Sequence, residues 1–196
     1  MSSISVEDVL NAYKNGYFPM AEPETGEIYW YSPDPRAIFP LGTLNSPRLI
    51  KQIIKHGIFN FKIDTVFGEV IEACARRDDS WISDEIIRLY RKLHEAGYAH
   101  SVEAWHEGEL VGGLYGVSIG GAFFGESMFY KISNASKACF YVLCEHLKKR
   151  NFILLDSQFM NYFTQSLGAI EIPKRDYILT LKKALQLQVG FNDEIF

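Results

Sequence analysis

Gly125-Glu126-Ser127-Met128-Phe129 closes one predicted strand of this chain, and Asp156-Ser157-Gln158 closes another. A predicted helix from about Asn134 to Arg150 lies between them, so the two strands belong to a strand–helix–strand crossover. Both strands are otherwise apolar, and a polar group buried there without a partner costs roughly 2–7 kcal/mol. Such groups are tolerated mainly where they serve one another or a ligand. A site is therefore expected at these two strand ends.

The segments around this crossover predict an α+β domain. Antiparallel strands are expected at 99–105, 109–118 and 122–129, joined by turns at Glu107-Gly108 and Gly120-Gly121. A strand at 58–63 and two helices precede them, and a strand at 152–156, a short helix, a strand near 170 and a final helix follow. This order, β-α-α-β-β-β-α-β-α-β, resembles the GNAT acyltransferase fold, a mixed sheet flanked by helices. Fold resemblance alone does not give function.

The N-terminal part is predicted to be a separate small unit. Ser5 caps a first helix that Gly16 ends, and residues 17–40 are rich in proline and aromatic residues. The closely spaced prolines exclude a helix there, so an ordered irregular segment is expected. We place the boundary near residue 33, between a truncated N-terminal unit (1–33) and the GNAT-like domain (34–196). Ser46 and Asp64 are predicted to cap the next two helices.

Composition limits the classes of function. The chain has 196 residues, 47% of them hydrophobic, which is enough for one substantial core. Its net charge is −4, so nucleic acid could bind only through a local basic patch. The cysteines, which are Cys74, Cys139 and Cys144, form no C-x-x-C pair, so free thiols are expected and neither a disulfide nor a metal site. Without a signal peptide or an apolar membrane span, a cytoplasmic protein is expected.

Two sequence features concern phosphate binding. The glycines between Gly112 and Gly125 match no dinucleotide or P-loop pattern, and the helix start at 132–137 lacks the Q/R-x-x-G-x-G/A loop with which GNAT enzymes hold CoA. CoA is therefore not expected as the acyl carrier. Arg48, Lys51 and Lys55 share one face of a predicted helix. That face is either an ordinary solvated surface or a phosphate-binding stripe.

The end of the strand at 152–156 is the strongest candidate for chemistry. Its apolar run is followed by Asp156 and Gln158, which lie on the same side if the strand persists. The carboxylate could then orient the Gln amide so that its oxygen faces a substrate N–H. Alternatively, Asp156 only caps the following helix.

The chain resembles the leucyl/phenylalanyl-tRNA–protein transferase family over nearly its whole length. The stretches that carry the resemblance are Ala12-Tyr13-x-x-Gly16-x-Phe18-Pro19, Trp30-x-Ser32-Pro33-Asp34-Pro35-Arg36, Ser80-Trp81-Ile82, residues 90–103, Leu110-Val111-Gly112-Gly113-Leu114-Tyr115-Gly116, Gly125-Glu126-Ser127-Met128-Phe129, Ala135-Ser136-Lys137, Asp156-x-Gln158 and Ser166-Leu167-Gly168-Ala169.

This resemblance implies an aminoacyltransferase that moves Leu, Phe or Met from aminoacyl-tRNA to the N-terminal Arg or Lys of acceptor proteins, marking them for degradation. It implies no cofactor, because the tRNA ester is already activated. Asp156 and Gln158 would be catalytic, and Arg48, Lys51 and Lys55 would contact tRNA. An apolar pocket for the aminoacyl side chain would be lined by Met20, Trp81, Leu114, Glu126, Met128, Leu143 and Leu155. Unbranched and aromatic walls suit a pocket that takes all three side chains.

Two departures from the family pattern stand out. The usual N-terminal extension is mostly missing, and Phe163 stands where the family commonly has His. We expect a monomer without membrane contact. The competing functions are an acyl-CoA N-acetyltransferase, which the missing CoA loop disfavours, and a non-catalytic tRNA-binding module. Such a module would need neither Asp156 nor Gln158.

Overall fold

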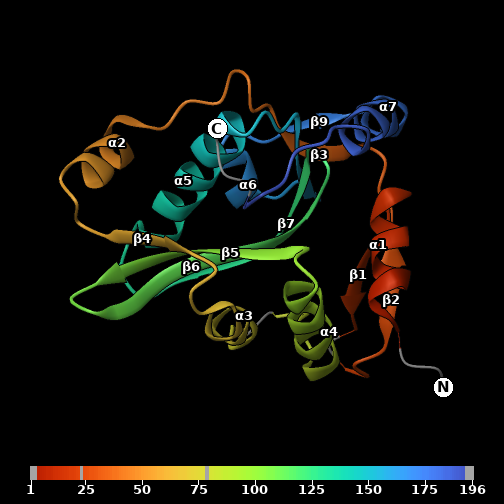
Figure 1. Cartoon of the computed structure of the whole chain (residues 1–196), viewed down its shortest axis with the longest axis horizontal. Coiled ribbons are helices and arrows are strands. Elements are labelled where there is room, and N and C mark those ends of the chain that lie inside the picture. Colours follow the sequence, from red (N-terminus) through yellow and green to blue (C-terminus); the bar gives the residue numbers. More distant parts are fainter. Residues whose placement is uncertain (1–3, 23, 78–79, 193–196) are drawn as a thin grey trace.

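The computed structural model describes residues 4–22, 24–77 and 80–192 and contains one large mixed sheet (Figure 1). Its seven strands run in the order β4 (Asn60–Ile63), β5 (Ala99–His106), β6 (Glu109–Ile119), β7 (Ala122–Tyr130), β8 (Leu154–Gln158), β3 (Arg36–Phe39) and β9 (Ile170–Ile172). A separate hairpin pairs β1 (Phe18–Ala21) with β2 (Ile28–Tyr31). The α+β class is confirmed.

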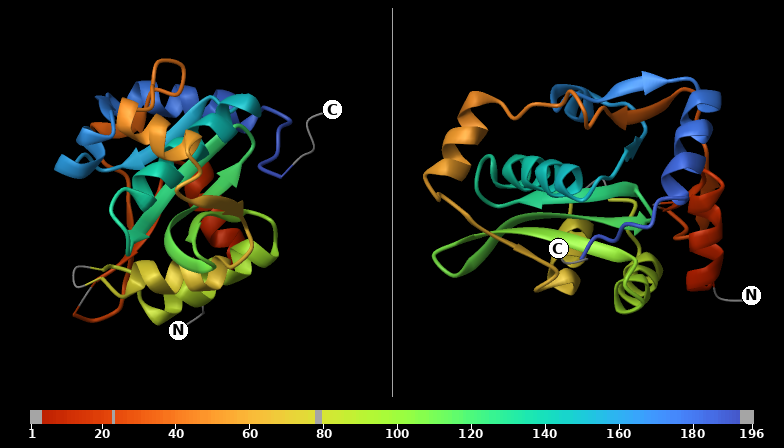
Figure 2. Two further views of the ribbon diagram at one scale, coloured as in Figure 1. Left: turned by 90° about the vertical axis from the view of Figure 1, so that its left-hand side faces the viewer. Right: turned by 45° about the horizontal axis from the view of Figure 1, so that its top comes forward.

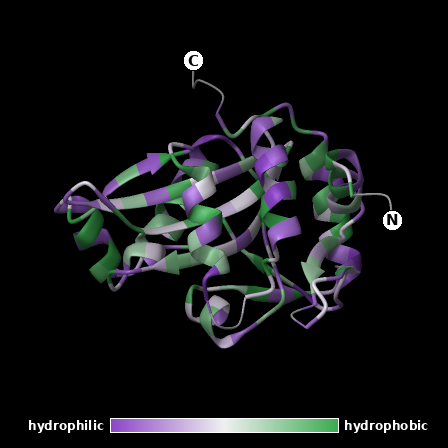
Figure 3. Cartoon of the chain, turned by 90° about the horizontal axis from the view of Figure 1, so that it is seen from below, coloured by the Kyte–Doolittle hydropathy of each residue, from purple (hydrophilic) through white to green (hydrophobic). Residues whose placement is uncertain are grey.

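Helices cover both faces of the sheet (Figure 2). One hydrophobic cluster joins the sheet to α1 (Val6–Lys14), α3 (Phe67–Ala75), α4 (Asp84–Glu95) and α7 (Lys174–Leu185). A second cluster, on the other face, joins it to α5 (Ala135–Lys149), α2 (Arg48–Lys55) and the residues that directly follow α6 (Tyr162–Ser166). Purple and green segments alternate along the helices in Figure 3, as expected for helices that bury one side only.

The crossover is the part of the fold that positions the site. Strands β4 to β7 pair antiparallel, and α5 then leads to β8, which pairs parallel with β7. This is the GNAT-like arrangement expected from the sequence. The β7–β8 ladder is short, because only residues 122–124 pair with residues 154–156. Beyond Phe124 and Asp156 the two strands continue without pairing to each other.

The expectation of an irregular segment at 17–40 was wrong, because the segment contains three strands. Pro19 lies in a two-stranded ribbon, Pro33 and Pro35 precede β3, and Pro40 follows it. A proline has no backbone N–H to donate, but at these places few hydrogen bonds between strands are lost. The prolines therefore do not prevent strands from forming here. The first hydrophobic cluster also runs across residue 33, since it joins Tyr13 and Phe18 to the sheet. The division into two units stays a prediction.

Two predicted helix caps were also wrong. Glu103 accepts hydrogen bonds from the N–H groups of Thr65 and Val66 at the start of α3, at 2.9 Å each, and thereby takes the place expected for Asp64. Asp64 instead accepts from the Ser101 N–H. Helix α2 begins after Pro47 without a side-chain cap. The caps by Ser5 on α1 and Ser83 on α4 are confirmed.

All three cysteines are buried and free. Within the described ranges, no helix has the length and apolar character needed to cross a bilayer.

Candidate functional site

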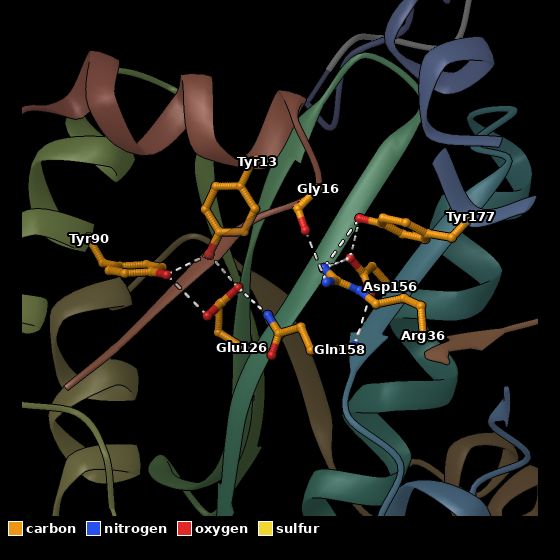
Figure 4. Close-up of polar contacts among 8 residues, drawn as sticks. All are labelled: Tyr13, Gly16, Arg36, Tyr90, Glu126, Asp156, Gln158 and Tyr177. Atoms are coloured by element: carbon orange, nitrogen blue, oxygen red, sulfur yellow. Dashed lines mark hydrogen bonds and ion pairs between the residues drawn. The ribbon is translucent and has the colours of Figure 1, made fainter. Parts of the chain in front are cut away.

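The candidate site lies where β7 and β8 stop pairing. Two consecutive residues of β6, Tyr115 and Gly116, pair with Ser127 and Gly125 of β7. Glu126, which lies between these two partners, is therefore the extra residue of a β-bulge in β7. A bulge turns a side chain away from the regular alternation of the strand. The Glu126 carboxylate accordingly reaches toward α1 and α4, where it meets Tyr13 and Tyr90 (Figure 4).

Glu126 accepts three hydrogen bonds. Tyr13 Oη and Gln158 Nε2 donate to its Oε1 at 2.6 and 2.8 Å, and Tyr90 Oη donates to its Oε2 at 3.1 Å. The two tyrosine hydroxyls also lie 2.5 Å from each other. We call these four groups, Tyr13, Tyr90, Glu126 and the Gln158 amide, the Glu126 network.

Burial is the main cause that raises the pKa of Glu126 to about 7, and the nearby Asp156 charge acts in the same direction. The hydrogen bonds from Tyr13, Tyr90 and Gln158 oppose that rise. Both tyrosines have pKa values raised by burial and by the Glu126 charge, so they remain neutral donors. Glu126 thus changes charge close to neutral pH.

Asp156 belongs to a different cluster. Arg36 donates to both its oxygens, from Nε at 2.9 Å and from Nη2 at 2.6 Å, and Tyr177 Oη donates at 2.8 Å. Arg36 is 1% exposed and Asp156 is fully buried. We call Arg36, Asp156 and Tyr177 the Arg36 clamp.

The Arg36 clamp ties distant segments together. Arg36 Nη1 donates to the carbonyl of Gly16, at 3.1 Å, at the end of α1, where Gly16 has a φ of +82° that few other residues adopt. The guanidinium lies 4.7 Å from the centroid of the Phe18 ring and 4.5 Å from that of Tyr177. Although burial opposes the charged form, the Asp156 carboxylate raises the pKa of Arg36 above its usual value. The pair is therefore a fully desolvated, charge-balanced contact.

The expected contact between Asp156 and the Gln158 amide was wrong. Asp156 Oδ1 accepts instead from the backbone N–H of Gln158, at 2.9 Å. Gln158 has a φ of +66°, so the alternation of the strand does not extend to its side chain. Glu126 holds the amide through Nε2, and Gln158 Oε1 accepts no hydrogen bond from any residue that the structure describes. That oxygen is therefore available to accept a hydrogen bond.

The residues expected around an aminoacyl pocket divide between the two faces of the sheet. Leu114, Met128, Leu143 and Leu155 share the second hydrophobic cluster, in which Leu114 lies opposite Met128. Met20 and Trp81 pack against the first cluster. The three leucines are 3%, 2% and 2% exposed and belong to the buried core. Met128 and Glu126 are partly exposed. The structure thus places four of the seven, Met128 included, in one hydrophobic cluster, and the pocket stays a prediction.

The basic residues expected to contact tRNA lie elsewhere. Arg48, Lys51 and Lys55 are exposed on α2, whose Ile50 is buried on the opposite side. Helix α2 packs against α5 at the end of the molecule away from α1 (Figure 1). None of the three forms an ion pair with the residues that the structure describes, and a phosphate-binding role stays a prediction.

Four residues of the site were not singled out from the sequence: Tyr13, Arg36, Tyr90 and Tyr177. Tyr13 and Tyr90 occupy buried positions on helix faces, where aromatic residues usually serve the core. The one available signal was Arg36 at the start of the apolar run Ala37-Ile38-Phe39, since an arginine in a buried strand needs a partner.

The chain is similar to one family of known proteins along nearly its whole length. The family model described as leucyl/phenylalanyl-tRNA protein transferase matches residues 38–182, and the model for the N-terminal domain of that family matches residues 2–34. A leucyl/phenylalanyl-tRNA–protein transferase of Gloeobacter violaceus is 50% identical over 189 residues, which are 96% of this chain and 98% of that relative. One of Chlorobaculum tepidum is 47% identical over 192 residues, covering 96% and 99%.

Among solved structures, L-PGS from Bacillus licheniformis is similar with a TM-score of 0.44 and 15% identity, over 80% of this chain and 51% of that one. The N-terminal truncation expected from the sequence is not seen relative to the two transferases, which the chain spans almost from end to end. With a family model that matches residues 38–182, and with relatives about half identical along nearly their full length, the chain belongs to the leucyl/phenylalanyl-tRNA–protein transferase family.

Proposed function

We propose that this chain transfers Leu, Phe or Met from the 3′ end of an aminoacyl-tRNA to the N-terminal Arg or Lys of acceptor proteins, which marks them for degradation. The observation that supports this most is the Gln158 amide, which Glu126 fixes through Nε2 where β7 and β8 stop pairing. Its Oε1 has no hydrogen-bond donor among the described residues. Such an oxygen can accept a hydrogen bond from an attacking amine.

The reaction is an acyl transfer. The neutral α-amine of the acceptor attacks the ester carbonyl, a C–N bond forms, and the C–O bond to the ribose breaks. The amine loses a proton and the ribose oxygen gains one. Gln158 Oε1 accepts an N–H of the attacking amine and orients its lone pair toward the carbonyl carbon. Much of the rate enhancement comes from holding two bound substrates in this geometry.

Glu126 supplies the negative charge of the site. Because Arg36 neutralises Asp156, an ionised Glu126 has no cationic partner among the residues that the structure describes. It stabilises the positive charge that develops on the amine as the C–N bond forms. Its pKa of about 7 also suits it to hold the released proton.

Asp156 acts on the reaction indirectly, through Gln158. Its carboxylate is enclosed by Arg36, Tyr177 and the Gln158 N–H, so it does not face the substrate. We assign it the role of a positioning residue that holds Gln158 in its left-handed conformation. The aminoacyl side chain lies against Met128, and the tRNA phosphates lie on Arg48, Lys51 and Lys55. The protein acts as a cytoplasmic monomer.

The decisive experiment is incubation of the protein with charged leucyl-tRNA and a peptide that begins with Arg, followed by mass measurement. We expect the peptide to gain the mass of one leucyl residue. The same peptide with an acetylated N-terminus is the matched control, because it lacks the attacking amine. Leucine transfer to neither peptide would contradict the proposal, and acetyl transfer from acetyl-CoA would favour the N-acetyltransferase alternative.

A further inference from the structure

An unusual group of aromatic side chains follows Gln158 directly. Phe159, Tyr162 and Phe163 are 41%, 89% and 37% exposed, and we call them the α6 aromatic patch. Single exposed aromatic residues are common, but a concentration of them beside a reactive group marks a contact surface. Neither the Glu126 network nor the Arg36 clamp includes any of the three.

The patch extends from the N-terminal hairpin to α5. The Phe159 ring lies edge-on to Phe18 of β1, with centroids 5.4 Å apart. At the other end, Lys137 Nζ of α5 lies 5.9 Å from the centroid of the Phe163 ring. Phe163 is five residues from Gln158, so the backbone of the whole patch lies within about 18 Å of the Gln158 backbone.

We infer that the α6 aromatic patch, with Lys137, stacks the unpaired nucleotides that precede the 3′ end of the aminoacyl-tRNA. The inference rests on the proposed function, which places the tRNA ester at Gln158. Nucleotides attached to that ester must leave the site along the neighbouring surface. Proteins commonly bind single-stranded nucleic acid through aromatic rings beside a cationic side chain. The rings stack on the bases, and the cation binds the backbone phosphates.

A single-stranded RNA suits this patch better than an acceptor polypeptide does. The unpaired end of tRNA is the same in all tRNAs, so fixed rings can serve every donor, whereas acceptor proteins differ beyond their first residue. The cation at the patch also favours a phosphate over an acceptor whose N-terminus is itself cationic. Helix α5, which carries Lys137, packs against α2 as well, so the patch and the basic face of α2 flank one helix.

The test is the double variant Tyr162→Ala/Phe163→Ala in steady-state transfer. Loss of stacking should raise KM for leucyl-tRNA by about 5- to 150-fold, with kcat and the KM for the acceptor peptide unchanged. Leucyl-adenosine, which lacks the preceding nucleotides, should be used as well by the variant as by the wild type. Tyr98→Ala is the matched control, since Tyr98 is 37% exposed at the turn before β5.

Two further variants separate stacking from other effects. Tyr162→Phe/Phe163→Tyr keeps both rings and should retain the wild-type KM. The triple variant Arg48→Ala/Lys51→Ala/Lys55→Ala should flatten the log–log salt dependence by about 0.7–0.9 for each phosphate that is no longer bound, whereas the aromatic variant should leave that slope unchanged.

Three results would overturn the inference. An unchanged KM for leucyl-tRNA in the double variant would show that the rings do not stack. A raised KM for the peptide would identify the patch as an acceptor surface instead. Equal loss with leucyl-tRNA and leucyl-adenosine would indicate damage to the site. Failure of the proposed function is recognised separately, because the wild type would then transfer leucine to no peptide.

Discussion

Two polar clusters meet at Gln158, and they are built in opposite ways. The Arg36 clamp is fully buried, balanced in charge, and bonded at each carboxylate oxygen. The Glu126 network is buried except at Glu126 itself, which is partly exposed, and it carries a negative charge above a pKa of about 7. It ends in an amide oxygen that accepts no hydrogen bond from the described residues. Gln158 contributes its backbone to the first and its side chain to the second. The Arg36 clamp thus holds the backbone of Gln158 in place, whereas the Glu126 network holds its side chain.

The largest effect is expected from breaking the clamp. Arg36→Met leaves Asp156 as a buried charge without its partner, which should cost about 3–5 kcal/mol of unfolding free energy, measured by urea denaturation. The double variant Arg36→Met/Asp156→Leu removes both charges and should recover much of that stability but not the transfer activity. A single variant as stable as the wild type would show that the clamp is not the rigid part of the site.

Gln158→Ala tests the other cluster. Loss of the amide should lower kcat by an amount equivalent to about 2–4 kcal/mol, by analogy with the removal of a transition-state hydrogen bond. Affinity for aminoacyl-tRNA should hardly change, because the amide acts on the attacking amine. Ser157→Ala is the control, since the Ser157 side chain makes no hydrogen bond with the described residues. Weaker tRNA binding at an unchanged kcat would refute the assignment.

Of the two clusters, the Glu126 network is the one that should depend on pH near neutrality. The pKa of Glu126 is raised from 4.5 to about 7 in the folded protein, so the stability that its protonated form contributes is complete below about 4.5 and is lost as the pH rises through 7. Between pH 5 and 8 this loss amounts to about 3 kcal/mol at most. Denaturation of the wild type and Glu126→Gln at both pH values should show it only in the wild type.

Transfer should follow the same titration with the opposite sign. The rate at limiting substrate should rise through pH 7 as Glu126 gains its charge, in addition to a rise near pH 8 from the α-amine. Glu126→Gln should lose the first rise and keep the second. If the variant retains both, the amine alone sets the profile and Glu126 has no part in it.

The smallest effect is expected outside both clusters. Met128→Ala should lower kcat/KM for leucyl- and phenylalanyl-tRNA by about 1–3 kcal/mol, because the aminoacyl side chain then packs against less apolar surface, without altering the KM of the peptide. Val142→Ala, at a partly buried position of the same hydrophobic cluster, should affect stability only. Equal damage to the use of both substrates would place Met128 in the general core.

The sequence pointed to the candidate site but did not predict the contacts within it. Asp156 and Gln158 were identifiable because polar residues end an apolar strand. Their contacts were not, since period-two alternation fails at a residue with a φ of +66°. Arg36 reaches Asp156 across 120 residues of sequence, and no local pattern encodes such a pairing. The crossover was predictable from hydrophobic runs and turns. Strands β1 to β3 were not, because the prolines within and around them indicated irregular structure.

The Arg36 clamp joins segments that are far apart in the sequence, and this has a consequence for biosynthesis. Arg36 is held by Gly16 near the start of the chain and by Tyr177 in α7 near its end, and Tyr177 also completes the shell around Asp156. A chain still on the ribosome therefore lacks one side of this shell until α7 has emerged. We expect a growing chain to acquire an ordered Gln158 only after α7 has been made, so that shorter nascent chains hold no working acyltransferase.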